Sequence, residues 1–211
     1  MIIDDDILLS WGASYRKLSA GETVFAEGAE ALFYYQLQNG SVRCVNISND
    51  GKEFIQNIAE PGESFGEFAL FDDQPYAITA IANVDSLVLR LCKATFQSLL
   101  KEYPEIHFKF SQCFSSLLRF KFMLIKEIAN TNPEQTILSL FNYFKENKRQ
   151  VCLNCNKVQL TRQQIADMTG LRVETVIRTV RNLQAKGHVT ISKGKIYYIE
   201  QARHSEAHLS E

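Results

Sequence analysis

The first half of the chain alternates short hydrophobic runs with turn-forming residues. Between residues 14 and 95, runs rich in β-branched and aromatic residues are separated by Gly, Asn, Asp and Pro. The segments "QNGS" and "SNDGKE" contain Asn-Gly and Asp-Gly pairs, which favour tight hairpins. This pattern predicts a β-sandwich or jelly roll whose glycines lie at the turns.

From about Ala94 onward, the hydrophobic spacing becomes helical. A short helix over residues 93–103 is predicted to end before Pro104, which suits the first position of a second helix of about 26 residues. This second helix carries two apolar stripes, so one can pack on the chain's own β-domain while the other needs a second partner. The stripe with alternating steps of four and three residues predicts a homodimer seam, and a helix buried within a monomer is the alternative. The seam residues are Phe110, Cys113, Leu117, Phe120 and Leu124, and the second stripe comprises Phe114, Leu118, Phe122 and Ile125.

A pair of short helices is predicted in the last third of the chain, after a further helix opened by Pro133. The stretch "LTRQQIADMTGLRVETVIRTVRNL", residues 160–183, breaks near Gly170, as a helix-turn-helix does. Thr161 is the expected N-cap of the first helix. The apolar face of the second helix, over about residues 172–185, comprises Val176, Val180 and Leu183. The segment "KGHVTISKGKIYYI" then predicts a β-hairpin, or wing, that turns at Lys193-Gly194.

Polar side chains face outward on the second of these helices or lie at its N-terminal end. Arg178 can bind guanine O6 and N7 together, and Glu174 can accept a hydrogen bond from a cytosine amine. A carboxylate on an otherwise basic face favours base recognition, and the alternative is a surface helix with a Glu174–Arg178 ion pair. The predicted DNA-binding residues are Thr161, Arg162, Arg172, Glu174, Thr175, Arg178, Arg181, Lys193 and Lys195.

Charge is distributed unevenly along a chain whose formal net charge is −1. Residues 1–103 contain 7 Lys and Arg against 15 Asp and Glu, whereas residues 157–203 contain 9 against 3. A basic C-terminal segment behind an acidic body is typical of a nucleic-acid-binding module joined to another domain. A solvated charged surface is the alternative explanation of the same balance.

The composition is typical of a folded protein from a reducing compartment. The chain is 45% hydrophobic, and its longest dense apolar run, "LLRFKFMLI", is too short to span a bilayer. Its acidic N-terminus argues against a secretory signal. Five scattered cysteines argue against a disulfide framework. We therefore expect a cytoplasmic protein that makes no membrane contact.

Together, these motifs resemble the CRP/FNR superfamily of bacterial transcription regulators over essentially the whole chain. "GETVFAEGAEALFYYQLQNGSVRCV" and "DGKEFIQNIAEPGESFGEFALFDD" are similar to the cyclic-nucleotide-binding-type β-roll of that family, and "LTRQQIADMTGLRVETVIRTVRNLQAKGHVTISKGKIYYI" is similar to its winged helix. The resemblance implies a homodimer through the long helix, an inverted-repeat operator in double-stranded DNA, and regulation by recruiting or blocking RNA polymerase.

The fold class implied is α+β: an N-terminal double-stranded β-helix (jelly roll), a long dimerisation helix and a C-terminal winged helix-turn-helix. The expected domains are the β-roll sensor over 1–103, the dimerisation helix over 104–130 and the winged helix-turn-helix over 131–203, followed by a polar tail over 204–211.

The segment "VETVIR" is more similar to the FNR branch of the family than to the cAMP-receptor branch. Val173 stands where cAMP-receptor-like members carry a base-contacting arginine, whereas Glu174 and Arg178 match both branches. The resemblance therefore implies a half-site that contains TGA. Ile177 replaces the serine of FNR-type members and leaves the outer base pairs open, and Arg162 matches a phosphate-contacting position.

The segment "FGEFALFDDQPYAITA" occupies the place of the family's phosphate-binding cassette. Gly66 and Glu67 match its opening residues, but Tyr76-Ala77 replaces the Arg-Ser pair that binds the cyclic phosphate. Losing both groups removes charge-assisted hydrogen bonds of about 1.5–3 kcal/mol each. We therefore expect no cAMP binding, although the family's effector pocket maps to Gly66, Glu67, Phe68, Ala69, Tyr76, Ala77 and Thr79.

Other cofactors of the family have weaker counterparts in this sequence. The N-terminal cysteine cluster that would hold an iron–sulfur centre is absent, since the first cysteine is Cys44. Haem would have His107 as a candidate ligand, which is a single histidine and a weak signal. Cys152-x-x-Cys155 has the spacing of a thiol or metal pair, but no second pair accompanies it. A structural hairpin is favoured there over redox sensing, and no metal site is expected.

The sequence contains no Walker loop, no Gly-x-Ser-x-Gly and no His-Glu-x-x-His, so it does not predict an enzyme. The competing hypothesis is a stand-alone ligand- or redox-sensing module that acts through protein partners and not through DNA. That hypothesis leaves the basic C-terminal segment unexplained.

Overall fold

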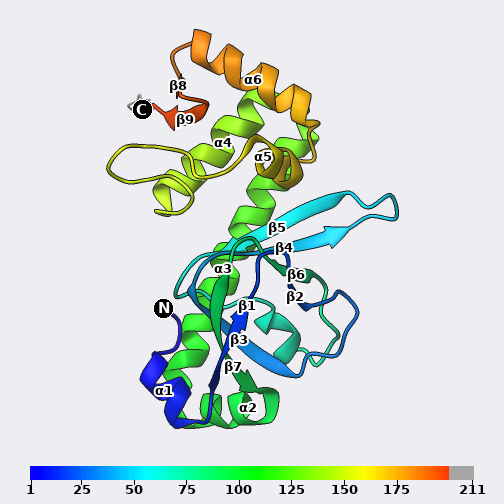
Figure 1. Ribbon diagram of the computed structural model, residues 1–211, viewed down its shortest axis with the longest axis vertical. Helices are drawn as coiled ribbons and strands as arrows, with labels where there is room; N and C mark the ends of the chain where they lie inside the picture. Colours follow the sequence, from blue (N-terminus) through cyan, green and yellow to red (C-terminus); the bar gives the residue numbers. More distant parts are fainter. Residues whose placement is uncertain (200–211) are drawn as a thin grey trace, which may run out of the picture. The chain divides into compact units, whose positions relative to one another are not determined.

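The computed structural model describes residues 1–199 (Figure 1). The chain forms two compact units that divide after Leu118, within its longest helix. A β-rich N-terminal part, a long helix and a C-terminal helix-turn-helix with a two-stranded wing follow one another along the chain. The predicted fold class is thereby confirmed. The expected domain boundaries stay a prediction, and the expected polar tail, 204–211, lies outside the described residues.

Two antiparallel sheets form the N-terminal β-roll. One has the strand order β1-β7-β3 and the other β2-β6-β4-β5. The strands are β1 (Ser14–Leu18), β2 (Thr23–Phe25), β3 (Phe33–Asn39), β4 (Val42–Ile47), β5 (Glu53–Ala59), β6 (Thr79–Ala82) and β7 (Ser86–Cys92). The core contains side chains from both sheets, such as Tyr34, Leu37, Val42 and Val88, each completely buried.

The sequence analysis missed a short helix at the N-terminus, α1 (Asp5–Ser10). The carboxylate of Asp4 caps it by accepting a hydrogen bond from the N–H of Asp6 at 2.9 Å. The acidic residues of this segment therefore have a structural use, because negative charge is stabilising in the first turn of a helix. Leu8 anchors the helix in the β-roll core.

Two further helices follow the β-roll, α2 (Lys93–Glu102) and α3 (Pro104–Ala129). The predicted start of α3 at Pro104 is confirmed. Phe96 of α2 stacks on Tyr34 of β3 at 4.7 Å, and Phe110 of α3 meets the same ring edge-on at 6.0 Å. The first half of α3 is thereby part of the β-roll core.

The structure corrects the predicted dimer seam. Phe110, Phe120 and Leu124 are at most 4% exposed within the single chain, so they cannot also line an interface with a second copy. Phe120 instead stacks on Tyr143 at 4.5 Å, within the C-terminal unit. Cys113 and Leu117, the remaining seam residues, are half-buried. Three of the five predicted seam residues are therefore covered by the chain's own packing.

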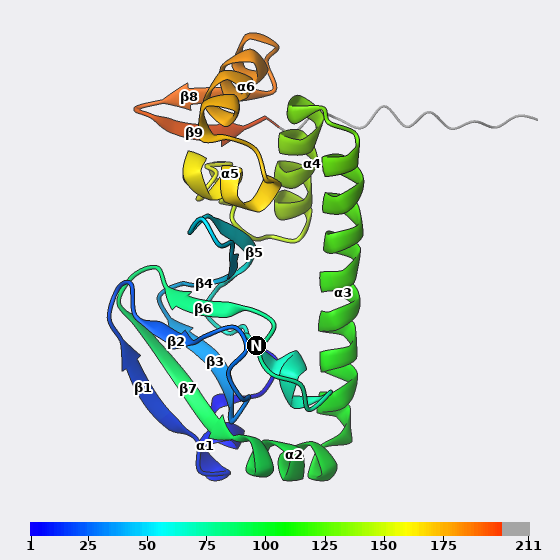
Figure 2. The same ribbon diagram turned by 90° about the vertical axis from the view of Figure 1, so that its right-hand side faces the viewer.

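A different face of α3 is exposed to solvent, and Figure 2 shows the helix at full length. Among the exposed positions of this helix, one set repeats in steps of three and four, as a coiled-coil seam requires. They are Phe108, Ser111, Ser115, Leu118, Phe122, Ile125 and Ala129. Three of them belong to the second stripe of the sequence analysis, whose fourth member, Phe114, packs against the β-roll core.

The C-terminal unit contains the predicted winged helix-turn-helix. Its elements are α4 (Pro133–Glu146), α5 (Arg162–Thr169), α6 (Val173–Ala185), β8 (Val189–Ser192) and β9 (Lys195–Tyr198). The segment between α4 and α5 forms a hairpin closed by an antiparallel bridge between Val151 and Val158. Among the described residues, no helix is long and apolar enough to cross a membrane.

Candidate nucleic-acid interface

Helices α5 and α6 are defined by local signals at their ends. Thr161 caps α5 by accepting from the N–H of Gln164 at 3.1 Å, and the Gln164 side chain accepts in return from the N–H of Thr161 at 2.9 Å. This reciprocal pair is a capping box. Gly170 ends the helix with φ at 70°, a left-handed conformation that glycine adopts without strain. The predicted break between the two helices is confirmed.

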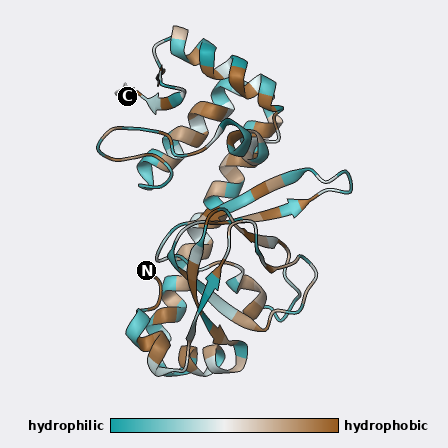
Figure 3. Ribbon diagram, in the orientation of Figure 1, coloured by the Kyte–Doolittle hydropathy of each residue, from teal (hydrophilic) through white to brown (hydrophobic). Residues whose placement is uncertain are grey.

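Helix α6 is amphipathic. Its buried side comprises Val176, Thr179, Val180 and Leu183, which includes all three predicted apolar positions. Figure 3 shows hydrophobic and hydrophilic bands alternating along it. The predicted polar residues Arg172, Glu174, Arg178 and Arg181 are exposed, and Thr175 is half-buried. The helix therefore presents a polar face that includes its N-terminal end.

Glu174 and Arg178 are both free to bind a ligand. Within residues 1–199, neither side chain makes an ion pair or a side-chain hydrogen bond, so the predicted alternative of a surface ion pair is not formed. Glu174 lies in the first turn of α6, where the helix dipole also stabilises a carboxylate. Its presence on a basic face therefore has a structural reason that does not depend on base recognition.

The wing lies beside the start of α5. Lys193 and Gly194 form the turn between β8 and β9, both with positive φ as a tight hairpin requires. Nη1 of Arg162 donates a hydrogen bond to the carbonyl oxygen of Gly194 at 2.9 Å. Lys193 and Lys195 are exposed on either side of Gly194. Arg162 therefore has a structural interaction that the sequence did not indicate, and its other N–H groups stay available to a phosphate.

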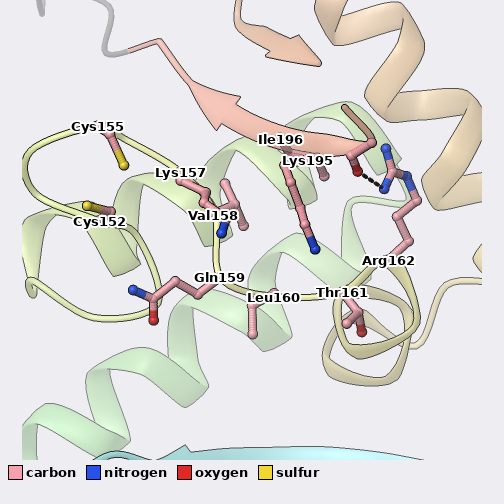
Figure 4. Close-up of a pocket in the computed structure, with 11 residues that line it drawn as sticks. Cys152, Cys155, Lys157, Val158, Gln159, Leu160, Thr161, Arg162, Lys195 and Ile196 are labelled. Atoms are coloured by element: carbon pink, nitrogen blue, oxygen red, sulfur yellow. Dashed lines mark hydrogen bonds between the residues drawn. The ribbon is translucent and has the colours of Figure 1, made fainter. Parts of the chain in front are cut away.

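A pocket of about 510 Å³ lies between the 151–158 hairpin, β9 and the start of α5 (Figure 4). Several predicted DNA-binding residues line it, namely Thr161, Arg162 and Lys195, and Lys157 adds a further cation. Cys152 and Cys155 lie at the opposite end, with their sulfur atoms turned toward one another. The sequence placed these two sets of residues in one domain but did not indicate that they share a pocket.

The cassette of the β-roll is filled by an aromatic cluster. Tyr76 stacks on Phe25 with ring centroids 3.7 Å apart, and its hydroxyl donates to the carbonyl oxygen of Phe33 at 3.0 Å. Phe25 also packs on Phe65 and Tyr35. The position expected to hold a phosphate-binding arginine thus carries a buried ring that fills the core. The sequence analysis missed Phe25, Phe65 and Tyr35, since nothing in their spacing marks them as neighbours.

Gly66 has no room for a side chain. Its φ is 75°, and an added Cβ would lie 2.4 Å from Cζ of Phe25 and 3.2 Å from Cε1 of Tyr76. The glycine at this position is therefore required by the aromatic cluster, whatever the effector. It precedes the short 3-10 helix η1 (Glu67–Leu70), which contains Phe68 and the buried Ala69.

Glu67 is a buried carboxyl group. Burial raises the pKa of Glu67 from 4.5 to about 7, because the charged form loses its hydration. Within the described chain, its Oε2 atom has no hydrogen-bond partner. At the other end of the cassette, Ala77 is exposed and its carbonyl accepts from Asn46, while the buried hydroxyl of Thr79 accepts from the N–H of Glu27.

The candidate haem ligand His107 is exposed on α3. Its ring lies 6.0 Å from that of Phe71 in an edge-on arrangement. Among the described residues, no three His, Cys, Asp or Glu side chains are grouped as a metal site. The predicted absence of a metal and the haem hypothesis both stay predictions.

Both halves of the chain match known domain families. The cyclic nucleotide-binding domain matches residues 15–103, and the Crp-like helix-turn-helix domain matches residues 135–203. The chain belongs to the CRP/FNR superfamily of transcription regulators. CRP/FNR regulators bind DNA through the helix-turn-helix and are not enzymes, so both predictions are confirmed for the family to which this chain belongs.

Individual relatives of this CRP/FNR protein cover most of its length. The nitrogen fixation regulation protein FixK of Bradyrhizobium diazoefficiens is 27% identical over 88% of this chain and 78% of the relative. The anaerobic regulatory protein of Bacillus subtilis is 27% identical over 92% of this chain and 84% of the relative. The FixK match is consistent with the predicted leaning of the recognition helix toward the FNR branch.

The fold is also that of solved CRP/FNR structures. The c-di-GMP-responsive global regulator CLP of Xanthomonas campestris superposes with a TM-score of 0.75 at 17% identity. The match covers 93% of this chain and 100% of the CLP chain. At this level of identity the likeness concerns the fold alone.

Proposed function

We propose that this CRP/FNR regulator binds an inverted-repeat operator as a homodimer and acts on RNA polymerase in the cytoplasm. The observation that carries the proposal is the polar face of α6, where exposed Arg178 and Glu174 lie opposite buried Val176 and Val180. A recognition helix needs such a face, with base-reading residues near its N-terminal end and basic neighbours for phosphates.

The proposed division of labour separates base readers from phosphate-binding residues. Arg178 reads a guanine, and Glu174 accepts from a cytosine amine in a half-site that contains TGA. Lys193 and Lys195, exposed at the wing, neutralise backbone phosphates. Arg162 both supports the wing turn through its hydrogen bond to Gly194 and binds a further phosphate.

The proposed dimer forms through the exposed stripe of α3. Two copies of this helix would bury four large side chains each, namely Phe108, Leu118, Phe122 and Ile125, which are 55–68% exposed in the single chain. The hydroxyls of Ser111 and Ser115 donate to backbone carbonyls of their own helix at 3.0 and 2.8 Å. Their polar groups are therefore satisfied, and their small size lets two helices approach closely. A two-fold dimer of this kind would read an inverted repeat whose half-sites lie about one turn of DNA apart, about 34 Å.

The proposed sensor does not bind cAMP. The Tyr76 ring packs against Phe25 where a cyclic phosphate would need a cation, and Ala77 offers no hydroxyl. Isothermal titration calorimetry with cAMP should give no heat of binding at micromolar concentrations. A micromolar dissociation constant would contradict this part of the proposal.

The DNA-binding proposal is tested by a salt-titrated anisotropy assay on operators with a matched or substituted TGA half-site. Arg178→Ala should lose about 1–3 kcal/mol of discrimination at one base pair, or about 5- to 150-fold. Lys193→Ala should weaken binding to every sequence and reduce the salt slope by about 0.9 for each protomer. Lys101→Ala is the matched control, because Lys101 is an exposed lysine of the β-roll unit.

The two classes of variant must behave differently. An equal loss on every operator for Arg178→Ala would show that Arg178 binds phosphate and reads no base. A salt slope that Lys193→Ala leaves unchanged would remove the wing from the interface.

A further inference from the structure

The hairpin between α4 and α5 brings two thiols together at its turn. The N–H of Asn156 donates to the carbonyl oxygen of Cys152 at 2.8 Å, and the N–H of Cys152 donates to the carbonyl oxygen of Lys157 at 2.9 Å. The first of these bonds closes a turn of five residues, Cys152 to Asn156, and Cys155 lies within it. A disulfide needs a Cα separation of about 4.4–6.8 Å. The turn holds Cys152 and Cys155 close together in space, as such a bond requires.

The side chains are arranged for the same reaction. Figure 4 shows the two sulfur atoms facing one another across the turn. Cys155 is exposed, so an oxidant can reach the pair, and Cys152 is half-buried. Both cysteines are free thiols in this structure.

The surroundings of Cys152 favour its thiolate. A hydrogen bond from the Cys155 thiol, with further hydrogen bonds from the backbone N–H groups of Cys155 and Asn154, lowers the pKa of Cys152 below 9.0. Lys145 adds a nearby positive charge, and its ammonium group is held over the turn by the carbonyl oxygen of Leu153 at 3.4 Å. A thiolate is the form that reacts with peroxides and disulfides.

The same hairpin is bonded to the wing. The carbonyl oxygen of Asn156, the residue after Cys155, accepts from the N–H of Tyr198 in β9 at 2.8 Å. The N–H of Val158 donates to the carbonyl oxygen of Ile196 at 2.8 Å, and Lys157 pairs with Tyr197. Any change in the shape of the turn therefore acts on β9, the strand that carries Lys195.

We propose that Cys152 and Cys155 are a redox-active dithiol that peroxides convert reversibly into an intramolecular disulfide, and that this bond weakens DNA binding through the wing. The Cys152 thiolate attacks a peroxide oxygen, forming a sulfenic acid and releasing hydroxide. The Cys155 sulfur then attacks the Cys152 sulfur, so an S–S bond forms, the S–O bond breaks, and water leaves with the Cys155 proton. Two electrons pass from the two thiols to the peroxide, which is reduced to water and hydroxide.

The effect on the wing follows from the geometry of the bond. Disulfide formation draws the two sulfur atoms from hydrogen-bonding distance to about 2 Å. The turn must tighten, and it is joined directly to β9 through Asn156. The link to DNA rests on the proposed function, whereas the thiol reaction does not.

Peptide mass spectrometry of the full-length protein tests the reaction. Trypsin releases residues 150–157 as one peptide, because Arg149 precedes it and Lys157 ends it. After treatment with hydrogen peroxide and alkylation of the remaining thiols, this peptide should be two hydrogens lighter than the reduced form and carry no alkyl group. Dithiothreitol should restore both thiols. Free thiols, or separate sulfinic acids on the two residues, would overturn the proposal.

DNA binding by the same samples tests the consequence. Peroxide should weaken operator binding by the wild type and by Cys92→Ser, the control that removes an exposed thiol of the β-roll unit. The affinity should fall about fivefold for each backbone phosphate that the wing no longer neutralises at about 0.15 M salt, and the salt slope should become shallower. Cys152→Ser and Cys155→Ser should keep their affinity for the operator after the same peroxide treatment. Disulfide formation without a change in affinity would overturn the link to the wing. A reduced protein that binds no DNA would refute the proposed function, while the mass measurement still decides the disulfide.

Discussion

Replacing Phe122 by alanine removes the largest exposed contribution to the proposed dimer seam. Phe122 is 68% exposed in the single chain, and Leu118, one turn earlier, is 55% exposed. Both belong to the exposed stripe of α3. A change at either position should therefore leave the fold of each unit intact and act on association alone.

The magnitude follows from the exposed fraction of the side chain. Full burial of a phenylalanine side chain contributes about 2.5 kcal/mol. Covering the exposed part of Phe122 in two copies thus contributes about 3 kcal/mol, or about two orders of magnitude in the dimer dissociation constant. The corresponding effect for Leu118→Ala is about 2 kcal/mol, or about 30-fold.

Sedimentation velocity over a concentration series measures these dissociation constants. Leu32→Ala is the matched control for Leu118→Ala, because Leu32 is 49% exposed on the β-roll and lies away from the stripe. It should leave the dissociation constant unchanged. A wild type that is monomeric at micromolar concentrations would refute the reasoning, as would equal effects of the two leucine substitutions.

Three further predictions concern the β-roll and the corrected seam. The pKa of Glu67 is about 7 in the folded protein and 4.5 as the ordinary value that applies to the unfolded chain. The stability contributed by the protonated carboxyl is therefore complete below about pH 4.5 and is lost as the pH rises through 7. Urea unfolding of Glu67→Gln should therefore show a gain of about 3 kcal/mol over the wild type at about pH 8 and no gain at about pH 4; a gain of equal size at both would disprove the assignment. Gly66→Ala should lower the free energy of unfolding by about 1–3 kcal/mol more than Gly28→Ala, since Gly28 has a similar φ of 81° but nothing within 4 Å of an added Cβ. Phe110→Ala should cost about 3–5 kcal/mol of folding stability by thermal or urea denaturation, and an effect confined to dimerisation would restore the original seam.

Local signals in the sequence determined most of the element boundaries. Pro104 and Pro133 begin α3 and α4, Thr161 caps α5, and Gly170 ends it. Each of these signals acts through backbone geometry or a hydrogen bond within a few residues, so no distant part of the chain is needed to interpret it. The acidic segment before α1 carried the same kind of signal in Asp4, which the sequence analysis did not use.

The chemistry of the cassette was also visible in the sequence, though its packing was not. Replacement of the Arg-Ser pair by Tyr76-Ala77 removes the arginine cation and the serine hydroxyl, and this loss does not depend on how the chain packs. The Tyr76 ring stacks on Phe25, and both rings exclude a side chain at Gly66. These contacts depend on segments that are far apart in the sequence. Packing of this kind leaves no regular spacing of residues in the sequence from which it could be predicted.

Only the tertiary structure decided which stripe of α3 is left exposed to solvent. Both stripes are apolar and helically spaced, so the sequence alone favoured the more regular one, which contains Phe110 and Phe120. The β-roll covers the first of these and α4 covers the second, and the less regular stripe with Leu118 and Phe122 is left exposed. Burial is a property of what packs against a surface, and for α3 those neighbours come from elements distant in sequence.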